Sequence, residues 1–127
     1  MSWDLSFRVD AVEAICLCDA GGCDGSETTV SPSEAALYVS LSIGEDTGWG
    51  EVFCRLPGFS HRHKARIVQD IMAPHIVGER FGHPAHMTLT LSRATHRLAL
   101  EAGETGSFAH TIAGLDMAAW DAVARRL

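Results

Sequence analysis

The sequence predicts a small α+β domain in which a three-stranded antiparallel meander is followed by three helices. Residues 37–43 alternate apolar and polar side chains, which is typical of a half-buried strand. Near the end of the chain, Leu115, Ala119 and Val123 recur every four residues, which predicts a helix with one buried face. Because the strand-like segments precede the helix-like ones, we expect the helices to pack on one face of the meander.

The first strand is predicted over residues 7–18, which are rich in β-branched and apolar side chains. Its alternation changes along the way, because Phe7 and Val9 have one parity and Val12 has the other. A bulge near Ala11, or burial on both faces of the strand, would explain this change.

The second and third strands are predicted to form a hairpin. The second strand, residues 37–43, is followed by a turn at 44–48 and then by a third strand at 49–54. A glycine within a strand often marks a place where another backbone or a ring packs closely, and Gly50 occupies such a position.

Three helices are predicted after the hairpin. The first begins at Ser60, a favoured N-cap residue, and continues to about Met72, where Pro74 is expected to end it. The second begins at Pro84, since proline is favoured at the first helical position. Glycines then separate it from the last helix, about residues 108–127. The apolar positions of the second helix recur at helical spacing: Met87, Leu91, Ala94 and Leu98.

Composition limits the class of protein. The chain has 127 residues, enough for one domain with a real core, and carries a net charge of −6 with Lys64 as its single lysine. This charge argues against a nucleic-acid surface. No apolar run approaches the ~20 residues that span a bilayer, and the N-terminus lacks the pattern of a signal peptide. We therefore expect a cytoplasmic protein without nucleic-acid or membrane partners.

The four cysteines, Cys16, Cys18, Cys23 and Cys54, raise the possibility of a zinc site. Cys16 and Cys18 would share one face of a strand, so tetrahedral coordination is geometrically conceivable. The C-x-x-C spacing and a second pair of ligands are absent, however. The favoured interpretation is that reduced cysteines act as small buried hydrophobic residues.

A polar cluster at the start of the first helix, His61, Arg62, His63 and Lys64, could contain a general base or a metal pair. Residues i and i+2 of a helix do not face the same way, so the favoured interpretation is a solvated helix start.

Two further histidines, His83 and His86, are three residues apart and could face a partner, but a capping and surface role is favoured. The sequence contains no nucleophile elbow, P-loop, dinucleotide-binding or zinc-protease motif. Taken alone, the residues therefore show no self-contained catalytic site.

Two segments together carry a resemblance to a known family: S-I-G-E-D-T-G-W-G-E at 42–51 and A-G-L-D-M-A-A-W-D-A at 113–122. In this order and on this frame of strands and helices, they resemble the N-terminal capping domain of the mandelate racemase/muconate lactonizing enzyme family, in the enolase superfamily. The resemblance covers residues 1–127. It implies that the last helix leads toward a TIM-like barrel domain that is absent from this chain.

The resemblance also implies an enzyme that removes the proton α to a carboxylate, as an acid-sugar dehydratase or a racemase/epimerase. In the family the barrel supplies the Mg²⁺ ligands, the K-x-K base and often a His-Asp dyad, and the metal stabilises the enediolate. One lysine gives no K-x-K, and 127 residues cannot form a barrel of ~250 residues. We therefore expect no catalytic residue and no metal ligand in this chain, and no activity from it alone.

The role that the resemblance assigns to this chain is substrate selection by two loops, residues 19–33 and 54–60. From composition alone, residues 19–34 are equally compatible with a functional lid and with a disordered segment, and the resemblance favours the lid. The candidate substrate-contact residues are Arg55, His61, Cys23 and Asp24.

Arg55 is the foremost of these candidates. Its guanidinium would suit the polar or anionic end of a sugar acid, because arginine binds carboxylates and hydroxyls through a fixed donor fork. A surface cation paired with a nearby acid is the alternative.

In the last helix, Trp120 widens the apolar stripe. The resemblance assigns this broad face to the cap core and to contact with the barrel. Asp116 and Asp121 are interpreted as structural acids that bind backbone or basic groups.

The partners implied are the chain's own barrel and a small carboxylate such as a sugar acid, with a homo-oligomer expected at full length. The alternative hypothesis is a stand-alone, non-catalytic binding or interaction module with the same fold. The reading frame downstream of Leu127 distinguishes the two.

Overall fold

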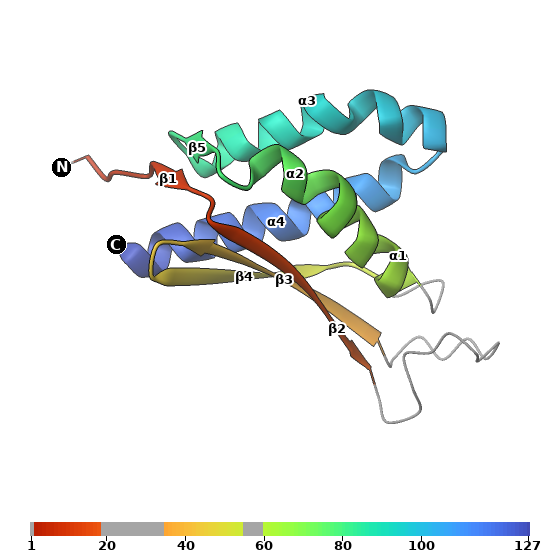
Figure 1. Ribbon diagram of the computed structural model, residues 1–127, viewed down its shortest axis with the longest axis horizontal. Helices are drawn as coiled ribbons and strands as arrows, with labels where there is room; N and C mark the ends of the chain where they lie inside the picture. Colours follow the sequence, from red (N-terminus) through yellow and green to blue (C-terminus); the bar gives the residue numbers. More distant parts are fainter. Residues whose placement is uncertain (1, 19–34, 55–59) are drawn as a thin grey trace.

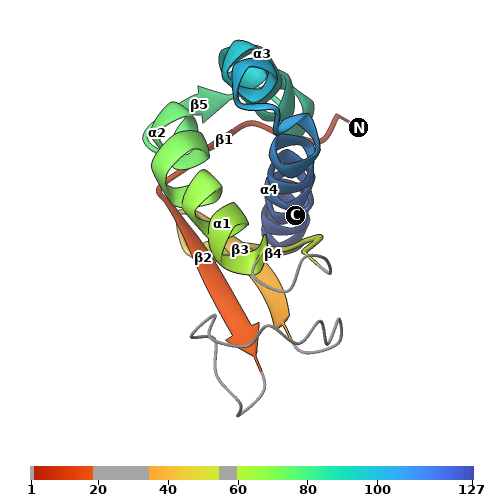
Figure 2. The ribbon, with the colours of Figure 1, turned by 90° about the vertical axis from the view of Figure 1, so that its right-hand side faces the viewer.

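The computed structural model describes residues 2–18, 35–54 and 60–127, and it confirms the predicted α+β architecture (Figure 1). A three-stranded antiparallel sheet has the order β2-β3-β4, and helices cover one of its faces. Viewed along the sheet, α1 and α4 lie next to the strands, and α3 is farthest from them (Figure 2). No helix in the described ranges is long and apolar enough to cross a membrane.

The meander has a continuous register. Its strands are β2 (Ala11–Cys18), β3 (Ala35–Ile43) and β4 (Asp46–Val52). Because Ile43 pairs with Asp46, the β3–β4 turn consists of only two residues, and the third strand begins earlier than predicted. Gly44 supplies the positive φ of 62° that this tight turn needs.

The predicted long first strand is two strands. β1 (Phe7–Arg8) pairs with β5 (Arg80–Phe81) in a separate two-stranded sheet, and the chain then joins the meander as β2. Val9 lies between them, fully buried, and its backbone bonds to Glu79 and Gly78. The change of parity thus reflects a change of pairing partner, and neither the bulge nor the two-face burial that we considered is needed.

The first helical segment extends further than predicted. α1 (Ser60–Arg66), a π-helical stretch η1 (Ile67–Met72) and α2 (Ala73–Ile76) follow one another without a break. Pro74 therefore lies inside the helical run and does not end it. Ala73 N–H bonds to the Val68 carbonyl, five residues back. Since the hydrogen-bond register changes just before Pro74, the missing N–H of the proline falls where the next segment begins.

The remaining helices are α3 (Pro84–Ala102) and α4 (Thr105–Arg126). α3 begins at Pro84 as predicted, and it ends at Gly103 in the left-handed conformation. Gly106, which was expected to precede the last helix, lies in the first turn of α4. The last helix therefore begins about one turn before its predicted start.

The sequence predicted the buried face of α4 better than that of α3. In α4, Leu115, Ala119 and Val123 are buried as expected, but Trp120 is 41% exposed. In α3, Met87 and Leu91 are buried, but the predicted Ala94 and Leu98 are exposed. Thr95 and Ala99 complete the buried stripe instead. Because α3 forms the outer layer, it buries only a narrow line of residues spaced by four.

Glycines allow α4 to lie directly on β4. A Cβ atom on Gly50 would overlap the Gly114 carbonyl, and one on Gly48 would overlap the Ala118 carbonyl. Gly114 is equally restricted by the side chain of Val52. The close packing predicted at Gly50 is thus confirmed, and the partner is the backbone of α4.

A carboxylate completes this contact. Asp121 Oδ2 accepts a hydrogen bond from the Trp49 N–H of the edge strand at 2.9 Å and another from Arg125 Nε at 2.9 Å. The backbone bond and then Arg125 lower the pKa of Asp121. Asp121 therefore has the structural role that was expected of it.

Candidate functional site

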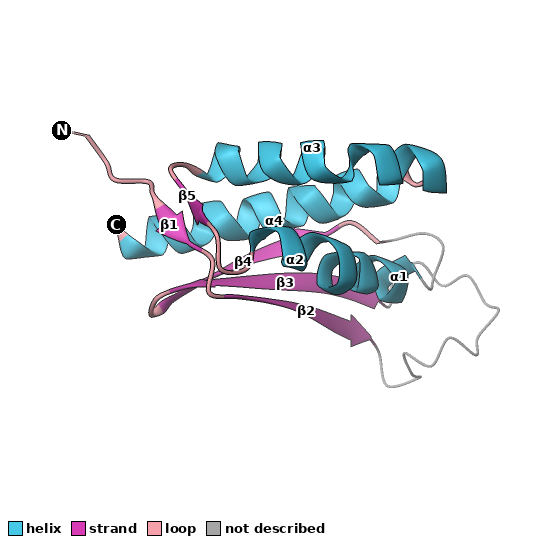
Figure 3. Ribbon diagram, turned by 45° about the horizontal axis from the view of Figure 1, so that its top comes forward, coloured by secondary structure: helices cyan, strands magenta, loops and turns pink. Residues whose placement is uncertain are grey.

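The described residues that flank segments 19–34 and 55–59 lie at one end of the sheet. Cys18, the last residue of β2, pairs with Ala35, the first residue of β3. At the same end, β4 finishes opposite Leu37, and Ser60 Oγ donates a hydrogen bond of 2.8 Å to the Cys54 carbonyl. Ser60 thus bonds to the end of the third strand, where we had expected an N-cap. Figure 3 shows this end of the sheet beside the start of α1.

Three of the four candidate substrate-contact residues, Arg55, Cys23 and Asp24, lie outside the described residues, as does most of the two predicted loops. Their roles remain predictions. His61 is the fourth, and it belongs to α1 at the end of the sheet just described.

The interpretation of the helix start as a solvated cluster is wrong for two of its members. His61 and Lys64 are each only 4% exposed, whereas Arg62 and His63 are exposed. His61 and Lys64 are three residues apart, so they share a helix face that Val68 continues. Neither ring nitrogen of His61 has a hydrogen-bond partner within the described part of the chain.

The ammonium of Lys64 is bound by groups from two other parts of the fold. Its Nζ donates to the Phe53 carbonyl at 2.5 Å and lies 3.0 Å from Nδ1 of His110, on α4. It also lies 5.5 Å from the centre of the Phe53 ring, within the range of a cation–π interaction. Burial lowers the pKa of Lys64, and the nearby Cys54 opposes this shift.

In this arrangement, Nδ1 of His110 carries no proton. An ammonium has no lone pair, so Lys64 is the donor and His110 Nδ1 is the acceptor. Burial and then the charge of Lys64 lower the pKa of His110. Its ring packs edge-on against Phe53 at 5.1 Å. The sequence analysis missed His110 and Phe53. The one available signal was that Lys64 falls on the buried face of its helix.

The two cysteines at this end whose side chains are described are free thiols. Cys16 Sγ lies 3.9 Å from the His61 carbonyl, and Cys54 Sγ lies 3.9 Å from the Ala35 carbonyl. Burial raises the pKa of both thiols. Such thiols are poor nucleophiles at neutral pH.

The described residues do not fit a metal ion. Within residues 2–18, 35–54 and 60–127, no group of three or more His, Cys, Asp or Glu side chains is placed to hold one. Asp121 is bound to Trp49 and Arg125, and Asp116 accepts a hydrogen bond from Thr88 at 2.5 Å. Both carboxylates have the structural role that was expected. Asp121 binds a backbone N–H and a basic group as predicted, whereas Asp116 binds the hydroxyl of Thr88, which is neither.

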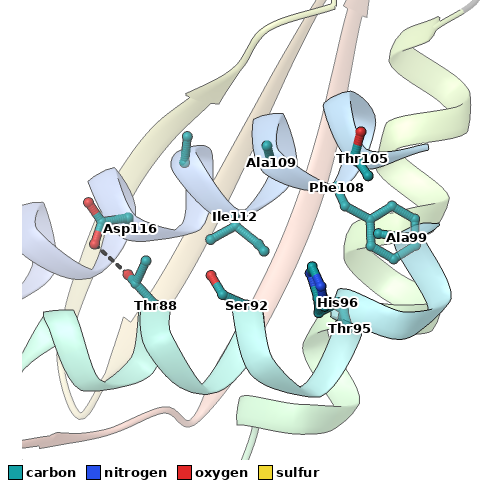
Figure 4. Close-up of a pocket in the computed structure, with 11 residues that line it drawn as sticks. Thr88, Ser92, Thr95, His96, Ala99, Thr105, Phe108, Ala109, Ile112 and Asp116 are labelled. Carbon is teal, nitrogen blue, oxygen red and sulfur yellow. Dashed lines mark hydrogen bonds between the residues drawn. The ribbon is translucent and has the colours of Figure 1, made fainter. Parts of the chain in front are cut away.

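A groove of about 430 Å³ lies between α3 and α4 (Figure 4). Phe108 and Ile112 line it from α4, and Thr88, Ser92 and His96 line it from α3. Apart from the structural Asp116, it contains none of the residues that the sequence singled out.

The second histidine pair lies at the start of α3. His83 is the N-cap residue, and its Nδ1 accepts a hydrogen bond of 3.0 Å from Ala85 N–H. The predicted capping role is therefore confirmed for His83. The exposed Trp120 packs edge-on against the ring of His83, with 5.0 Å between ring centres.

Comparison with protein families identifies the fold. The model of the mandelate racemase/muconate lactonizing enzyme N-terminal domain matches residues 12–127. This chain belongs to the mandelate racemase/muconate lactonizing enzyme family. The matched region is the N-terminal capping domain of the enolase superfamily, as the two sequence segments had indicated. Comparison with curated proteins gave no match.

Solved structures of family members agree with this assignment. A mandelate racemase/muconate lactonizing enzyme from Bordetella bronchiseptica superimposes with a TM-score of 0.81 at 32% identity, covering 95% of this chain and 31% of that one. A predicted mandelate racemase from Rhodobacter sphaeroides has a TM-score of 0.64 at 24% identity, covering 94% and 29%. A magnesium complex of a family protein from Paracoccus denitrificans has a TM-score of 0.63 at 21% identity, covering 90% and 26%. The last two show the fold alone.

The chain spans between 26% and 31% of the length of these relatives. Most of each relative therefore lies outside the matched part, which implies a further domain in the full-length proteins. The family is one of enzymes.

Proposed function

We propose that this chain is the capping and substrate-specificity domain of a Mg²⁺-dependent enzyme that abstracts the proton α to a carboxylate. The reaction would be the dehydration of an acid sugar, or racemisation or epimerisation. The family match over residues 12–127 is the observation that carries this proposal. In this proposal residues 1–127 are the cap, and α4 leads toward a barrel domain.

Catalysis and metal binding are assigned to the barrel. When bound, Mg²⁺ would stabilise the negative charge that develops on the substrate carboxylate. The magnesium complex of the Paracoccus denitrificans relative favours this metal. The described residues of the present chain offer no group of three potential metal ligands. In this proposal the cap closes the site and selects the substrate.

The end of the sheet near Cys18, Ala35 and Ser60 is the proposed substrate-facing end. The predicted loops 19–33 and 54–60 both leave the sheet there, which supports a shared role for them. A closed lid would exclude water and complete the pocket.

Within these loops, we propose that Arg55 binds the polar or anionic part of the substrate. His61, Cys23 and Asp24 are the further contact candidates. Of these, His61 is buried beside the proposed substrate-facing end.

Replacement of Arg55 in the full-length enzyme tests this proposal. Arg55→Ala should weaken transition-state binding by about 2–4 kcal/mol, because a charged hydrogen-bond donor to the substrate is lost. This corresponds to a fall of about 30- to 900-fold in kcat/KM on a sugar acid that the enzyme turns over.

Arg66→Ala provides the matched control. Arg66 is an exposed arginine paired with Asp70 on the same helix, and its loss should leave kcat/KM unchanged. An Arg55→Ala enzyme with wild-type kcat/KM would remove Arg55 from the substrate site.

A further inference from the structure

We propose that Lys64 is a positioning residue: its buried ammonium holds the end of β4 in the place from which the predicted specificity loop begins. This inference rests on the function proposed above, in which residues 54–60 face the substrate. It concerns a described residue that the sequence analysis placed in a solvated cluster and to which the family resemblance assigned no role.

The first step of the argument is the bond to Phe53. β4 ends at Val52, so the Phe53 carbonyl follows the last ladder residue. Lys64 Nζ donates to this carbonyl at 2.5 Å, which extends the fixed part of the strand by one residue. The cation also faces the Phe53 ring at 5.5 Å, so both the backbone and the side chain of Phe53 are held.

The second step is the bond to His110. The 3.0 Å contact with Nδ1 connects the same ammonium to α4, which packs along β4. A single nitrogen atom therefore joins α1, the end of β4 and α4. Ser60 Oγ adds a bond to the Cys54 carbonyl, so the strand end is tied to α1 at two consecutive residues.

The third step is energetic. No carboxylate in the described part of the chain pairs with Lys64, although the residue is only 4% exposed. Burying an ammonium is costly, and methionine would fill a similar volume without that cost. What lysine adds over methionine is its directed hydrogen bonds. One of those bonds holds the strand end, and the other connects the same ammonium to α4.

The structural part of the inference is tested by hydrogen exchange. Lys64→Met keeps the length of the side chain and removes the donors. We expect amide exchange at residues 52–54 to become at least about tenfold faster, because the strand end opens more often. His63→Ala is the control on the same helix, since His63 is exposed and its ion pair within the described ranges is with Glu104. A change of less than about twofold in Lys64→Met would overturn the inference.

A milder variant keeps the test decisive if Lys64→Met does not fold. His110→Phe retains a ring against Phe53 and removes the Nδ1 acceptor. Exchange at residues 52–54 should again become faster, by about threefold or more, since one of the two bonds is lost. Unchanged exchange in this variant would overturn the role of the contact between Lys64 and His110.

The positioning role itself is tested in the full-length enzyme, on a sugar acid that the wild type turns over. Lys64→Met should raise KM about tenfold and change kcat by less than about threefold, while His63→Ala changes neither. An unchanged KM with faster exchange would overturn positioning and leave only a structural bond. If the wild type turns over no acid, the proposed function fails and positioning fails with it, but the exchange result still decides whether Lys64 holds the strand.

Discussion

At the scale of single residues, the contact between β4 and α4 depends on glycines, which have no side chain. A Cβ atom on Gly50 would lie closer than 3.0 Å to backbone atoms of α4, and backbone atoms cannot move aside as a flexible side chain could. We therefore expect Gly50→Ala to destabilise the fold by about 3 kcal/mol or more, as measured by urea denaturation. A loss below about 1 kcal/mol would show that the helix can shift at little cost.

Gly106→Ala is the matched glycine control. A Cβ atom on Gly106 would meet nothing within 4 Å, and the residue lies in the first turn of α4. The substitution should stabilise the protein by about 0.5–1 kcal/mol, because alanine loses less backbone entropy in a helix.

The pairing of His110 with Lys64 predicts an acid-sensitive contribution to stability. The pKa of His110 is lowered in the folded protein, so the unfolded chain binds more protons as the pH falls from about 6.5 toward the folded pKa. Stability should therefore be lost over this interval. The His110→Gln variant should lose less free energy of unfolding than the wild type between about pH 8 and pH 5.

His75→Gln, which replaces an exposed histidine of α2, provides the comparison. It should retain the pH dependence of the wild type. If His110→Gln also retains that dependence, the histidine does not couple to folding.

At the scale of elements, one hydrogen bond links the outer helix α3 to α4. Thr88 Oγ1 donates to Asp116 Oδ1, and both residues are partly buried. Thr88→Val should cost about 1–2 kcal/mol in unfolding free energy, because it removes a hydrogen bond to a carboxylate. Thr90→Val is the control, since Thr90 is exposed and its hydroxyl donates to the His86 carbonyl of the same helix. Equal effects of the two substitutions would contradict a specific α3–α4 link.

The sequence predicted a helix or strand well wherever a single period of apolar residues determined it. The alternation of residues 37–43 located β3, and the four-residue spacing of Leu115 located the buried face of α4. Prediction failed where the position of an element in the fold determined which of its residues are buried. Leu98 fits the helical period of α3, yet it is exposed because the helix lies in the outer layer. Trp120 packs on His83 at the surface, which no local pattern of α4 indicates.

The candidate site was only partly predictable. The resemblance indicated two loops, residues 19–33 and 54–60, and the structure places the described residues that flank them at one end of the sheet. The residues that stabilise this end come from distant parts of the chain. Lys64 and His110 are 46 residues apart in sequence. The polar character of Lys64 suggested solvent exposure, and the sequence analysis did not consider His110. The packing of α1 and α4 brings the two residues together. The desolvation that lowers both pKa values depends on this packing, so it leaves no trace in local sequence.

At the scale of the whole molecule, the described chain lacks a set of metal ligands and corresponds to about a third of its relatives. We expect the 127-residue chain alone, mixed with Mg²⁺ and a panel of sugar acids, to form no dehydrated product and to invert no stereocentre. Keto-acid detection and polarimetry would measure the two reactions. Turnover by the isolated chain would contradict the assignment of catalysis to a barrel.

The bond between Trp49 and Asp121 also has a consequence for synthesis on the ribosome. The two residues are 72 positions apart, and α4 packs on the glycines of β4. At about 5–20 residues per second, translation needs about 4–14 s to pass from one to the other. During that interval the nascent hairpin presents an uncovered strand surface. The packing of α4 on β4 therefore waits until the last helix leaves the exit tunnel.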